Sequence, residues 1–195
     1  AGPANKQGRI AADNICGGNS RFTGSQGSSI LKLFGLTAAS TGINEKAAQA
    51  AGIAYDKVVL FPASHATYYP GAQSMAMKVL YEKESLRLLG AQIVGGDGVD
   101  KRIDVLATAI RAKMTALELT ELDLSYAPPY SSAKDPVNMA GFMIEDLESE
   151  KVRQFHWNEV EDLPCDGSAT LLDVRTAWEY QRGHLDGFRN IPLDD

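Results

Sequence analysis

Hydrophobic and polar residues alternate along several short segments of the chain, which is typical of β-strands. Residues 30–34 and 58–61 are apolar runs of strand length, and residues 75–81 alternate. The alternating segment places four apolar side chains on one face: Met75, Met77, Val79 and Tyr81. Residues 86–94 follow after a polar turn at residues 82–85, so the pattern predicts an antiparallel hairpin.

A helical repeat follows this hairpin. Five residues form one apolar stripe, with the spacing of a helix packed on a sheet: Ile103, Leu106, Ala107, Ile110 and Met114. Asp100 is expected to cap the start of this helix. Further capping signals predict three more helices: Asn44 before a helix ending near Gly52, Thr115 with Glu118 as a capping box, and Asp135 with Pro136 before a helix running towards Glu150.

Strands covered by helices predict an α+β domain, with an antiparallel sheet flanked by helices. Residues 1–18 add an amphipathic helix with Pro3 near its start, and residues 19–27 form a connector rich in Gly, Ser and Asn. The charged residues 148–153 are interpreted as a linker. The chain is therefore expected to have three parts: residues 1–24, 25–150 and 151–195.

The 195-residue chain is 44% hydrophobic and 23% charged, a composition typical of a globular protein. Its net charge of -6 argues against sequence-independent nucleic-acid binding, which requires clustered Lys and Arg. The sequence has no apolar run long enough to span a bilayer and no signal-peptide pattern, so we expect a soluble cytoplasmic protein without membrane partners. Ala1 is not an initiator methionine, and we expect the chain to be a fragment of a longer polypeptide.

The cysteines and histidines give no sign of a metal site or of a redox centre. Cys16 and Cys165 lie far apart without a second sulfur or a histidine at ligand spacing, and both are interpreted as incidental thiols. His156 and His184 show no ligand spacing either. The sequence also lacks a GxGxxG fingerprint and a redox cysteine motif, so we expect this chain alone to bind neither FAD nor NAD(P)H in a complete site.

Residues 126–141, with the sequence YAPPYSSAKDPVNMAG, are the stretch whose backbone is most constrained by its composition. Pro128 and Pro129 fix their own φ angles and restrict the residues before them. Tyr126 and Tyr130 are therefore expected at the ends of a stiff extended segment, which would hold two phenols at a fixed place.

Three motifs occur along the chain: LTAASTG at residues 36–42, HATYYPG at residues 65–71, and the YAPPY segment at residues 126–141. Together, and in this order, they resemble the C-terminal dimerisation domain of the FAD- and NAD(P)H-dependent disulfide reductases, in the coenzyme A-disulfide reductase and NADH oxidase group. The resemblance extends over residues 1–141. It implies a homodimer, with FAD and NAD(P)H held by N-terminal domains of the same polypeptide.

In the coenzyme A-disulfide reductase branch of this family, tyrosines of two of these motifs reach across the dimer to the partner's active-site cysteine. The resemblance implies this trans role for Tyr68 and Tyr126, while Tyr69 and Tyr130 are alternative candidates in the same motifs. A phenol suits the role because it donates a hydrogen bond to a thiolate while remaining uncharged at neutral pH. From the residues alone, all four remain equally consistent with half-buried interface aromatics.

The resemblance also identifies the first helix with the last helix of the FAD domain, whose N-terminus points towards the flavin. Pro3, Ala4 and Asn5 are the candidate flavin contacts, because the unpaired N–H groups and the positive dipole end of a helix stabilise negative charge. His65 lies in HATYY, which departs from the histidine motif of the glutathione and lipoamide reductases. It is therefore interpreted as a structural or solvent-facing histidine and not as an acid-base group.

Residues 171–193 resemble the first part of a second family, the rhodanese domains. The resemblance implies an initial strand and a helix capped by Thr176, with Asp173 and Arg175 near the pocket of an intact domain. Cys165 precedes the strand and does not take the position of the rhodanese nucleophile. This part is expected to be a truncated α/β segment whose strand and helix lack some of their packing partners.

Together the two resemblances imply the C-terminal part of an FAD-dependent NAD(P)H:disulfide oxidoreductase that reduces coenzyme A disulfide, polysulfide or persulfide. The fragment is expected to supply dimerisation and the trans tyrosines, and to be inactive alone. Two alternatives stay open: an NADH oxidase or peroxidase of the same family, and a dimerising module without activity.

Overall fold

The computed structural model describes residues 2–164 and 166–193. Cys165, interpreted above as an incidental thiol, and Ala1, at the start of the first expected helix, lie outside the described residues. The chain divides into two compact units, Ala1–Val152 and Arg153–Asp195, and each is described by itself.

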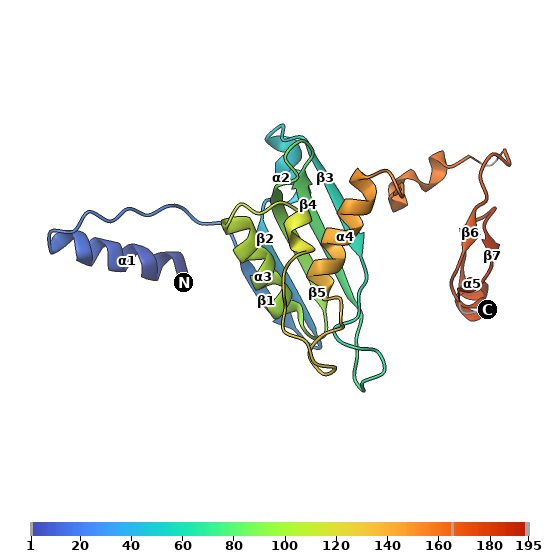
Figure 1. The fold of residues 1–195 in the computed structure, drawn as a ribbon, viewed down its shortest axis with the longest axis horizontal. Coiled ribbons are helices and arrows are strands. Elements are labelled where there is room, and N and C mark those ends of the chain that lie inside the picture. The colour runs from blue at the N-terminus through green and yellow to red at the C-terminus, as the bar shows by residue number, and fades with distance from the viewer. Residues whose placement is uncertain (1, 165, 194–195) are drawn as a thin grey trace. The chain divides into compact units, whose positions relative to one another are not determined.

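The first unit is built on a five-stranded sheet with the strand order β1-β2-β5-β4-β3 (Figure 1). Each pair of neighbouring strands in it runs antiparallel. The strands are β1 (Ser29–Leu33), β2 (Leu36–Gly42), β3 (Tyr55–Leu60), β4 (Met75–Glu82) and β5 (Leu88–Gly95). The expected fold class, an antiparallel sheet flanked by helices, is confirmed.

The hairpin expected from the alternating pattern is confirmed as β4 and β5, with Met77 opposite Ile93. The four side chains expected on one face of β4 are buried, each with 1% exposure or less: Met75, Met77, Val79 and Tyr81. Ala76, between two of them, is exposed on the other face. The alternation therefore corresponds to a fully covered face of the strand and a face that is open at Ala76 but closed at Leu80, which is 0% exposed.

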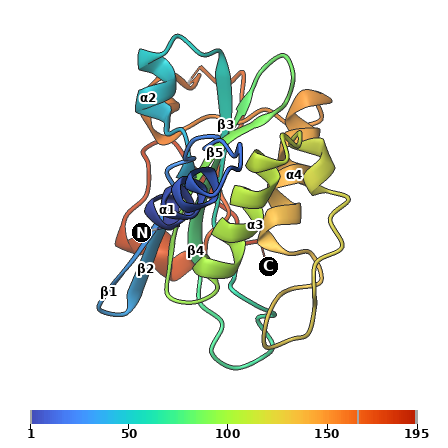
Figure 2. The ribbon, with the colours of Figure 1, turned by 90° about the vertical axis from the view of Figure 1, so that its left-hand side faces the viewer.

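Two helices, α3 (Val99–Arg111) and α4 (Pro136–Glu148), cover one face of the sheet (Figures 1 and 2). α3 lies over β2 and β5, and α4 contacts β3. Four helical side chains enter the apolar layer between helices and sheet: Ile103, Leu106, Val137 and Ile144. Full burial of each such side chain contributes about 1.5–3 kcal/mol, so this layer holds the helices on the sheet.

Strand β2 is not signalled by the alternating pattern, because its sequence LTAASTG contains mainly small and polar residues. Its backbone pairs with β1 on one side and with β5 on the other, and α3 packs over it. Small side chains leave room for the helix. Pairing on both edges, which a local pattern does not encode, makes this segment a strand.

The start of α3 corrects the expectation for Asp100, because Gly98 is the N-cap. Gly98 has a φ of 71°, in the left-handed region that glycine adopts without strain. A Cβ atom at this position would lie 2.2 Å from Nη1 of Arg102. Asp100 lies in the first turn of the helix instead, where its negative charge is favourable to the helix dipole.

The other expected caps in this unit are confirmed. Asn44 Oδ1 accepts a hydrogen bond from the Ala47 N–H at 2.8 Å, at the start of α2 (Glu45–Ala50). Asp135 accepts from the Val137 N–H at 3.0 Å at the start of α4. Both side chains thereby satisfy an N–H group that has no partner within its helix.

The capping box after α3 is also confirmed. The Thr115 N–H donates to Glu118 Oε2 at 2.7 Å, and the Glu118 N–H donates to Thr115 Oγ1 at 3.3 Å. This box precedes η1 (Leu117–Leu119), a short 3-10 helix. Leu119 is buried, so the turn is fixed on the core.

The helix expected at residues 1–18 is present as α1 (Gly2–Ile15), and none of its described residues is buried. The connector behind it is tied to the sheet and to α3 through Gln26. Its Nε2 donates to Thr41 Oγ1 at 2.8 Å and to the Ala107 carbonyl at 2.9 Å. Within the described part of the chain, no helix has the length and apolar character needed to cross a membrane.

The second unit contains a 3-10 helix, η2 (Trp157–Asp162), and one strand–helix–strand connection. That connection consists of β6 (Leu172–Asp173), α5 (Ala177–Arg182) and β7 (Arg189–Asn190). β6 and β7 pair in parallel, which confirms the α/β character expected here, and Thr176 caps α5 as expected. No described residue between positions 153 and 193 is buried, so this unit has no core of its own in this chain.

A charged cluster fixes α2 to the open side of the sheet. Glu45 accepts hydrogen bonds from Lys57 of β3 and, at 2.6 Å, from Lys78 of β4. Burial opposes ionisation of the Glu45 carboxyl, but these hydrogen bonds and one from Tyr55 outweigh it and lower its pKa to about 2. The ionised carboxylate therefore stabilises the attachment of α2.

Replacing Glu45 by Gln is expected to destabilise the chain at neutral pH and less so in acid. The pKa of about 2 lies below the ordinary value of 4.5, so the stabilisation is present above pH 4.5 and is lost as the pH falls towards 2. Urea unfolding at several pH values measures the difference in unfolding free energy between Glu45→Gln and the unchanged chain. Glu84→Gln, at an exposed position, is the control. A difference that did not shrink in acid would contradict the role of the Glu45 carboxylate.

Candidate functional site

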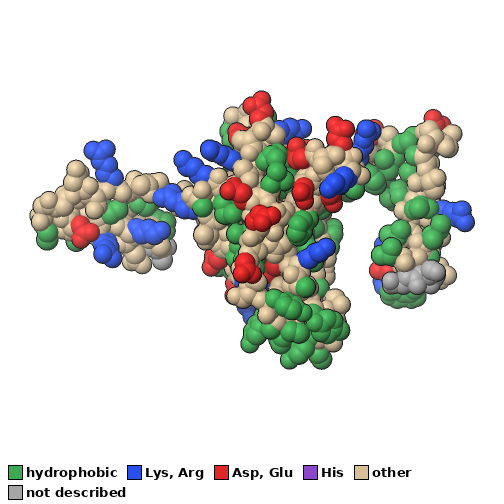
Figure 3. Space-filling model, viewed as in Figure 1, with side chains coloured by type: hydrophobic (Ala, Val, Ile, Leu, Met, Phe, Trp, Pro, Cys, Tyr) green, Lys and Arg blue, Asp and Glu red, His purple; other side chains and the backbone are tan. Residues whose placement is uncertain are grey.

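Two loops leave the same end of the sheet (Figures 1 and 2). One loop connects β3 to β4 and contains residues 65–71, and the other connects η1 to α4 and contains residues 126–130. All four candidate tyrosines lie on these two loops. Figure 3 shows hydrophobic side chains, with tyrosine and proline counted among them, gathered at this end of the unit.

The hydroxyl groups of Tyr68 and Tyr126 meet at 3.0 Å, although the residues are 58 positions apart in sequence. Both side chains remain open to solvent, with 75% of Tyr68 and 49% of Tyr126 exposed. A phenol both donates and accepts hydrogen bonds, so one hydroxyl hydrogen of the pair is left for a third group. The structure thus brings the two preferred candidates together in an accessible position.

This contact changes the acidity of one phenol. The hydrogen bond with Tyr68, followed by loss of hydration and by repulsion between the two phenol oxygens, raises the pKa of Tyr126 above its ordinary value. A hydrogen bond that a neutral phenol donates is lost on ionisation, so the bond favours the protonated form. The raised pKa keeps the Tyr126 hydroxyl protonated at neutral pH, and either hydroxyl can be the donor within the pair.

Tyr69 is occupied by a different contact. Its ring packs edge-on against His65, with the ring centroids 5.8 Å apart, and 43% of the residue is exposed. His65 is only 5% exposed, and its Nδ1 lies 3.1 Å from the Ala66 carbonyl oxygen. Of the structural and solvent-facing roles expected for His65, the structure supports the structural one.

Tyr130 lies in a turn, which differs from the continuous extended segment expected from the two prolines. The N–H groups of Tyr130 and Ser131 both donate to the Ala127 carbonyl, at 2.9 and 3.1 Å. Pro128 follows Ala127, at the turn position that its fixed φ suits. Tyr130 is 70% exposed and lies beyond this turn, outside the hydrogen-bonded tyrosine pair.

A buried ion pair lies where the loops meet the helices. Arg102 Nη2 of α3 is 3.0 Å from Asp135 Oδ2 at the start of α4, and the two residues are 1% and 3% exposed. Burial opposes ionisation of Asp135, but the Val137 N–H, the charge of Arg102 and the Ser131 hydroxyl outweigh it and hold its pKa below the ordinary range. The carboxylate is therefore charged at neutral pH.

Arg102 is a residue of this region that the sequence pattern does not single out. It occupies a buried position on α3 beside Val99, Ile103 and Leu106. The one available signal is that Arg102 is a charged residue within the apolar stripe of a helix. A buried Arg requires a negative partner, so this position indicates that an acidic residue lies nearby. The pattern does not name the partner, since Asp135 is recognisable in the sequence only as a helix cap.

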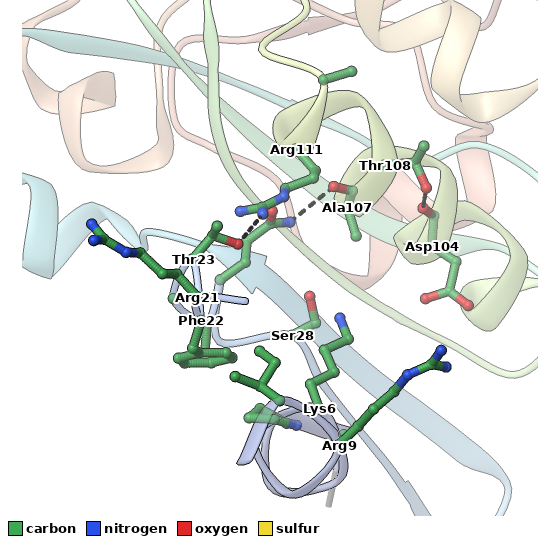
Figure 4. A pocket seen from close by; sticks show the side chains of 17 residues that line it. Lys6, Arg9, Arg21, Phe22, Thr23, Ser28, Asp104, Ala107, Thr108 and Arg111 are labelled. Carbon is green, nitrogen blue, oxygen red and sulfur yellow. Dashed lines mark hydrogen bonds between the residues drawn. The ribbon is translucent and has the colours of Figure 1, made fainter. Parts of the chain in front are cut away.

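The candidate flavin contacts Pro3, Ala4 and Asn5 lie in the first turn of α1 and are exposed. Four basic side chains line a hollow beside this helix (Figure 4): Lys6, Arg9, Arg21 and Arg111. In the part of the chain that the structure describes, no hydrogen bond connects the first turn of α1 to either tyrosine loop. The structure therefore does not bring the flavin candidates and the tyrosines together.

In the second unit, Asp173 and Arg175 form a two-pronged ion pair. Arg175 Nε lies 3.0 Å from Asp173 Oδ1, and Nη2 lies 2.6 Å from Oδ2. These hydrogen bonds hold the pKa of Asp173 below its ordinary range. His184 stacks on Tyr180 with ring centroids 3.8 Å apart. Among the described residues, no group of three or more His, Cys, Asp or Glu is placed to hold a metal ion.

Replacing Tyr68 by Phe is expected to lower the pKa of Tyr126 towards that of an isolated tyrosine, because Tyr126 loses its hydrogen-bond partner. NMR titration of the chain with ¹³C-labelled tyrosine measures the pKa of each phenol. Tyr69→Phe is the matched control, since Tyr69 packs on His65, and it should leave the pKa of Tyr126 unchanged. The same pKa of Tyr126 in Tyr68→Phe and in the unchanged chain would mean that the hydroxyl pair does not persist in solution.

Among curated proteins, the chain is similar to coenzyme A disulfide reductases of staphylococci. It is 41% identical to the enzyme of Staphylococcus haemolyticus over 145 residues, which are 74% of this chain and 32% of that protein. It is also 41% identical to the enzyme of Staphylococcus epidermidis over 140 residues. The chain spans about a third of the length of these curated relatives.

Two solved structures match nearly the whole chain. A reduced CoADR-RHD from Bacillus anthracis has a TM-score of 0.89 and 47% identity, over 98% of this chain and 34% of that one. An NAD-dependent persulfide reductase from A. fulgidus has a TM-score of 0.88 and 41% identity, over 97% and 34%. A water-forming NADH oxidase from Lactobacillus brevis, at 21% identity and a TM-score of 0.71 over 76% and 33% of the two chains, shares the fold.

The family of the pyridine nucleotide-disulphide oxidoreductase dimerisation domain matches residues 29–136. The matched range contains all five strands of the large sheet, helix α3 and both tyrosine loops. The resemblance noted in the sequence is thereby confirmed, and this chain belongs to the dimerisation-domain family of the pyridine nucleotide-disulphide oxidoreductases.

Proposed function

We propose that this chain is the dimerisation part of an FAD-dependent NAD(P)H:disulfide oxidoreductase acting on coenzyme A disulfide, polysulfide or persulfide. In this proposal Tyr68 and Tyr126 serve the active site of the partner subunit. The observation that carries it is the pair of exposed hydroxyls, from two different loops, at 3.0 Å. The relatives support the substrate class, because they include coenzyme A disulfide reductases and an NAD-dependent persulfide reductase.

Breaking a sulfur–sulfur bond suits a pair of neutral phenols. With a persulfide, the balanced reaction is RSSH + NAD(P)H + H⁺ → RSH + H₂S + NAD(P)⁺, in which the nicotinamide is oxidised and the sulfur–sulfur bond is reduced. A thiolate attacks one sulfur atom and the other leaves as an anion. A hydrogen bond from a phenol stabilises the negative charge on sulfur, and in this proposal the phenol also donates a proton to the leaving group.

In this proposal NAD(P)H would supply the electrons and FAD would pass them on, both bound by the N-terminal domains of the intact polypeptide. The contribution of this chain is the first turn of α1, where Pro3, Ala4 and Asn5 would lie against the flavin. That turn contains no acidic residue, and its free N–H groups and positive dipole end suit a group that becomes negatively charged. The chain by itself is expected to bind no cofactor and to be inactive.

We assign the three parts of the chain accordingly: residues 1–24 end an FAD-binding domain, residues 25–150 form the dimerisation domain, and residues 151–195 begin a rhodanese-like domain. The parallel pairing of β6 and β7 around α5 supports the last assignment. The ion pair of Asp173 and Arg175 at the end of β6 would help to frame the pocket of that domain. A rhodanese-like neighbour favours a sulfane sulfur compound as the substrate.

The trans role requires a homodimer, because the tyrosines of one chain would serve the cysteine of its partner. Membership of a dimerisation-domain family supports this assembly. The four candidate tyrosines are 43–75% exposed at one end of the unit, an aromatic surface that a second copy can cover: Tyr68, Tyr69, Tyr126 and Tyr130. A reaction that yields free thiols suits a reducing compartment, and we infer a cytoplasmic location.

The intact polypeptide is expected to oxidise NADH or NADPH with coenzyme A disulfide or coenzyme A persulfide as the acceptor. Parallel assays of nicotinamide absorbance with each sulfur compound, and with oxygen alone, measure the preference. Turnover with oxygen alone would contradict the proposal and support an oxidase of the same family.

In the intact polypeptide, Tyr126→Phe is expected to slow turnover about 100-fold, because it removes a hydrogen-bond donor and keeps the ring. Flavin content, measured by visible absorbance, should be unchanged. Tyr55→Phe is the control, since the Tyr55 hydroxyl bonds to Gln49 and Glu45 away from the loops. Equal rates for Tyr126→Phe and Tyr55→Phe would remove Tyr126 from the reaction.

A further inference from the structure

Arg102 is the largest fully buried side chain among the described residues, with 1% exposure. It lies on the face of α3 that packs into the apolar layer. Burying a charge is costly unless the charge is paired and hydrogen-bonded. Core stability alone does not explain an arginine here, because an apolar side chain of similar size would fill the same space without that cost.

The guanidinium group is held first by charge. Its Nη2 lies 3.0 Å from Asp135 Oδ2, and its Nε lies 3.4 Å from Oδ1. Its Nη1 donates to the Gly98 carbonyl at 3.2 Å, at the start of the same helix. These contacts fix the planar group between the N-terminal ends of α3 and α4.

The remaining contacts of Nη2 go to the bases of the two tyrosine loops. Nη2 donates to the Ser64 carbonyl at 2.9 Å, at the start of the loop that carries Tyr68. It also donates to the Tyr130 carbonyl at 3.2 Å and lies 3.3 Å from Ser131 Oγ, after the turn that follows Tyr126. Since Nη2 carries two hydrogens, these bonds are shared among several acceptors.

Neighbouring contacts reinforce the same junction. Lys101 Nζ donates to the Ser125 carbonyl at 3.2 Å, at the start of the second loop, and lies 3.6 Å from Asp135 Oδ2. The Ala66 N–H donates to the Ser131 carbonyl at 3.1 Å and so joins the two loops directly. The bases of both loops are therefore attached to one charged junction, formed by Lys101, Arg102 and Asp135. Further out, the loops are joined by the hydroxyls of Tyr68 and Tyr126.

We propose that Arg102, held by Asp135, is a positioning residue that sets the separation of Tyr68 and Tyr126. By donating to backbone carbonyls at the base of each loop, it fixes one loop relative to the other, and the tip hydroxyls then meet at 3.0 Å. The placement stands on these contacts alone, while its effect on turnover rests on the proposed function. Lysine cannot replace Arg102 here, because its single ammonium group does not offer the fixed planar set of N–H donors of a guanidinium group.

The first test examines the tyrosine pair in this chain and needs no activity. In Arg102→Lys the loops are expected to separate, so Tyr126 loses its partner and its pKa falls towards that of an isolated tyrosine. NMR titration with ¹³C-labelled tyrosine measures this pKa. The proposal is overturned if the pKa of Tyr126 is the same in Arg102→Lys and in the unchanged chain.

Tyr81→Phe is the matched control for loss of stability. It removes a partly buried hydrogen bond at the edge of the same core, from the Tyr81 hydroxyl to Glu148 Oε1 at 3.1 Å, near the far end of α4. The pKa of Tyr126 should be unchanged in this variant. A fall equal to that in Arg102→Lys would mean that any weakening of the core separates the pair, which also overturns a specific role for Arg102.

Ser131→Ala provides the same test if Arg102→Lys does not fold. It removes only the hydroxyl that accepts from Arg102 and donates to Asp135 Oδ2 at 2.8 Å. The pKa of Tyr126 is expected to fall by less than in Tyr68→Phe. An unchanged pKa of Tyr126 would count against the charged junction as the anchor of the loops.

The second test measures kcat of the intact polypeptide in a double-mutant cycle. Arg102→Lys is expected to lower kcat about tenfold and Tyr126→Phe about 100-fold, with flavin content unchanged. Because Arg102 acts through the tyrosine pair, adding Arg102→Lys to Tyr126→Phe should lower kcat no further. A double variant whose loss equals the product of the two single losses would overturn the link between Arg102 and the pair.

The two tests distinguish a failure of this proposal from a failure of the proposed function. A fall in the pKa of Tyr126 in Arg102→Lys, with kcat unaffected by Tyr126→Phe, supports the positioning role and removes Tyr126 from the reaction. A slow Tyr126→Phe enzyme, with the pKa of Tyr126 unaffected by Arg102→Lys, keeps the tyrosines in the reaction and overturns the positioning role.

Discussion

The apolar layer between the sheet and helices α3 and α4 determines where the other parts of the first unit lie. Burial of side chains such as Met77 and Leu106, at 0% and 1% exposure, holds the helices against the sheet. Each tyrosine loop joins an element of this layer to the next, so the bases of both loops emerge at one end of it. The position of the candidate site is thus a consequence of core packing, and the loops supply its chemistry.

The ion pair of Arg102 and Asp135 contributes directional hydrogen bonds to a layer that is otherwise held by non-directional apolar contacts. Packed apolar side chains tolerate small displacements, whereas hydrogen bonds from a planar guanidinium group require their acceptors at defined positions. The acceptors here include backbone carbonyls of both loops, so the charge that is costly to bury also specifies the geometry of the surface. Stability and placement are therefore supplied by different interactions at the same junction.

Sequence patterns predict the features that depend on neighbouring residues, such as the alternating face of residues 75–81. They do not predict β2, because its small residues carry no periodic signal and pairing with distant strands makes it a strand. The cap at Gly98 also depends on the Arg102 side chain four residues further along, whose position is fixed by its tertiary contact with Asp135. Resemblance to a family selects four tyrosines, but no local pattern says that Tyr68 and Tyr126 share a hydrogen bond across 58 residues.

The turn that follows Tyr126 lowers the backbone entropy that is lost when a molecule binds at this surface. Pro128 and Pro129 restrict the backbone, and two N–H groups bound to the Ala127 carbonyl restrict it further. Ordering one free backbone residue on binding would cost about 1–2 kcal/mol. Because this turn is already ordered, a molecule that docks on the two hydroxyls freezes little additional motion, and its affinity is governed by the contacts that it makes.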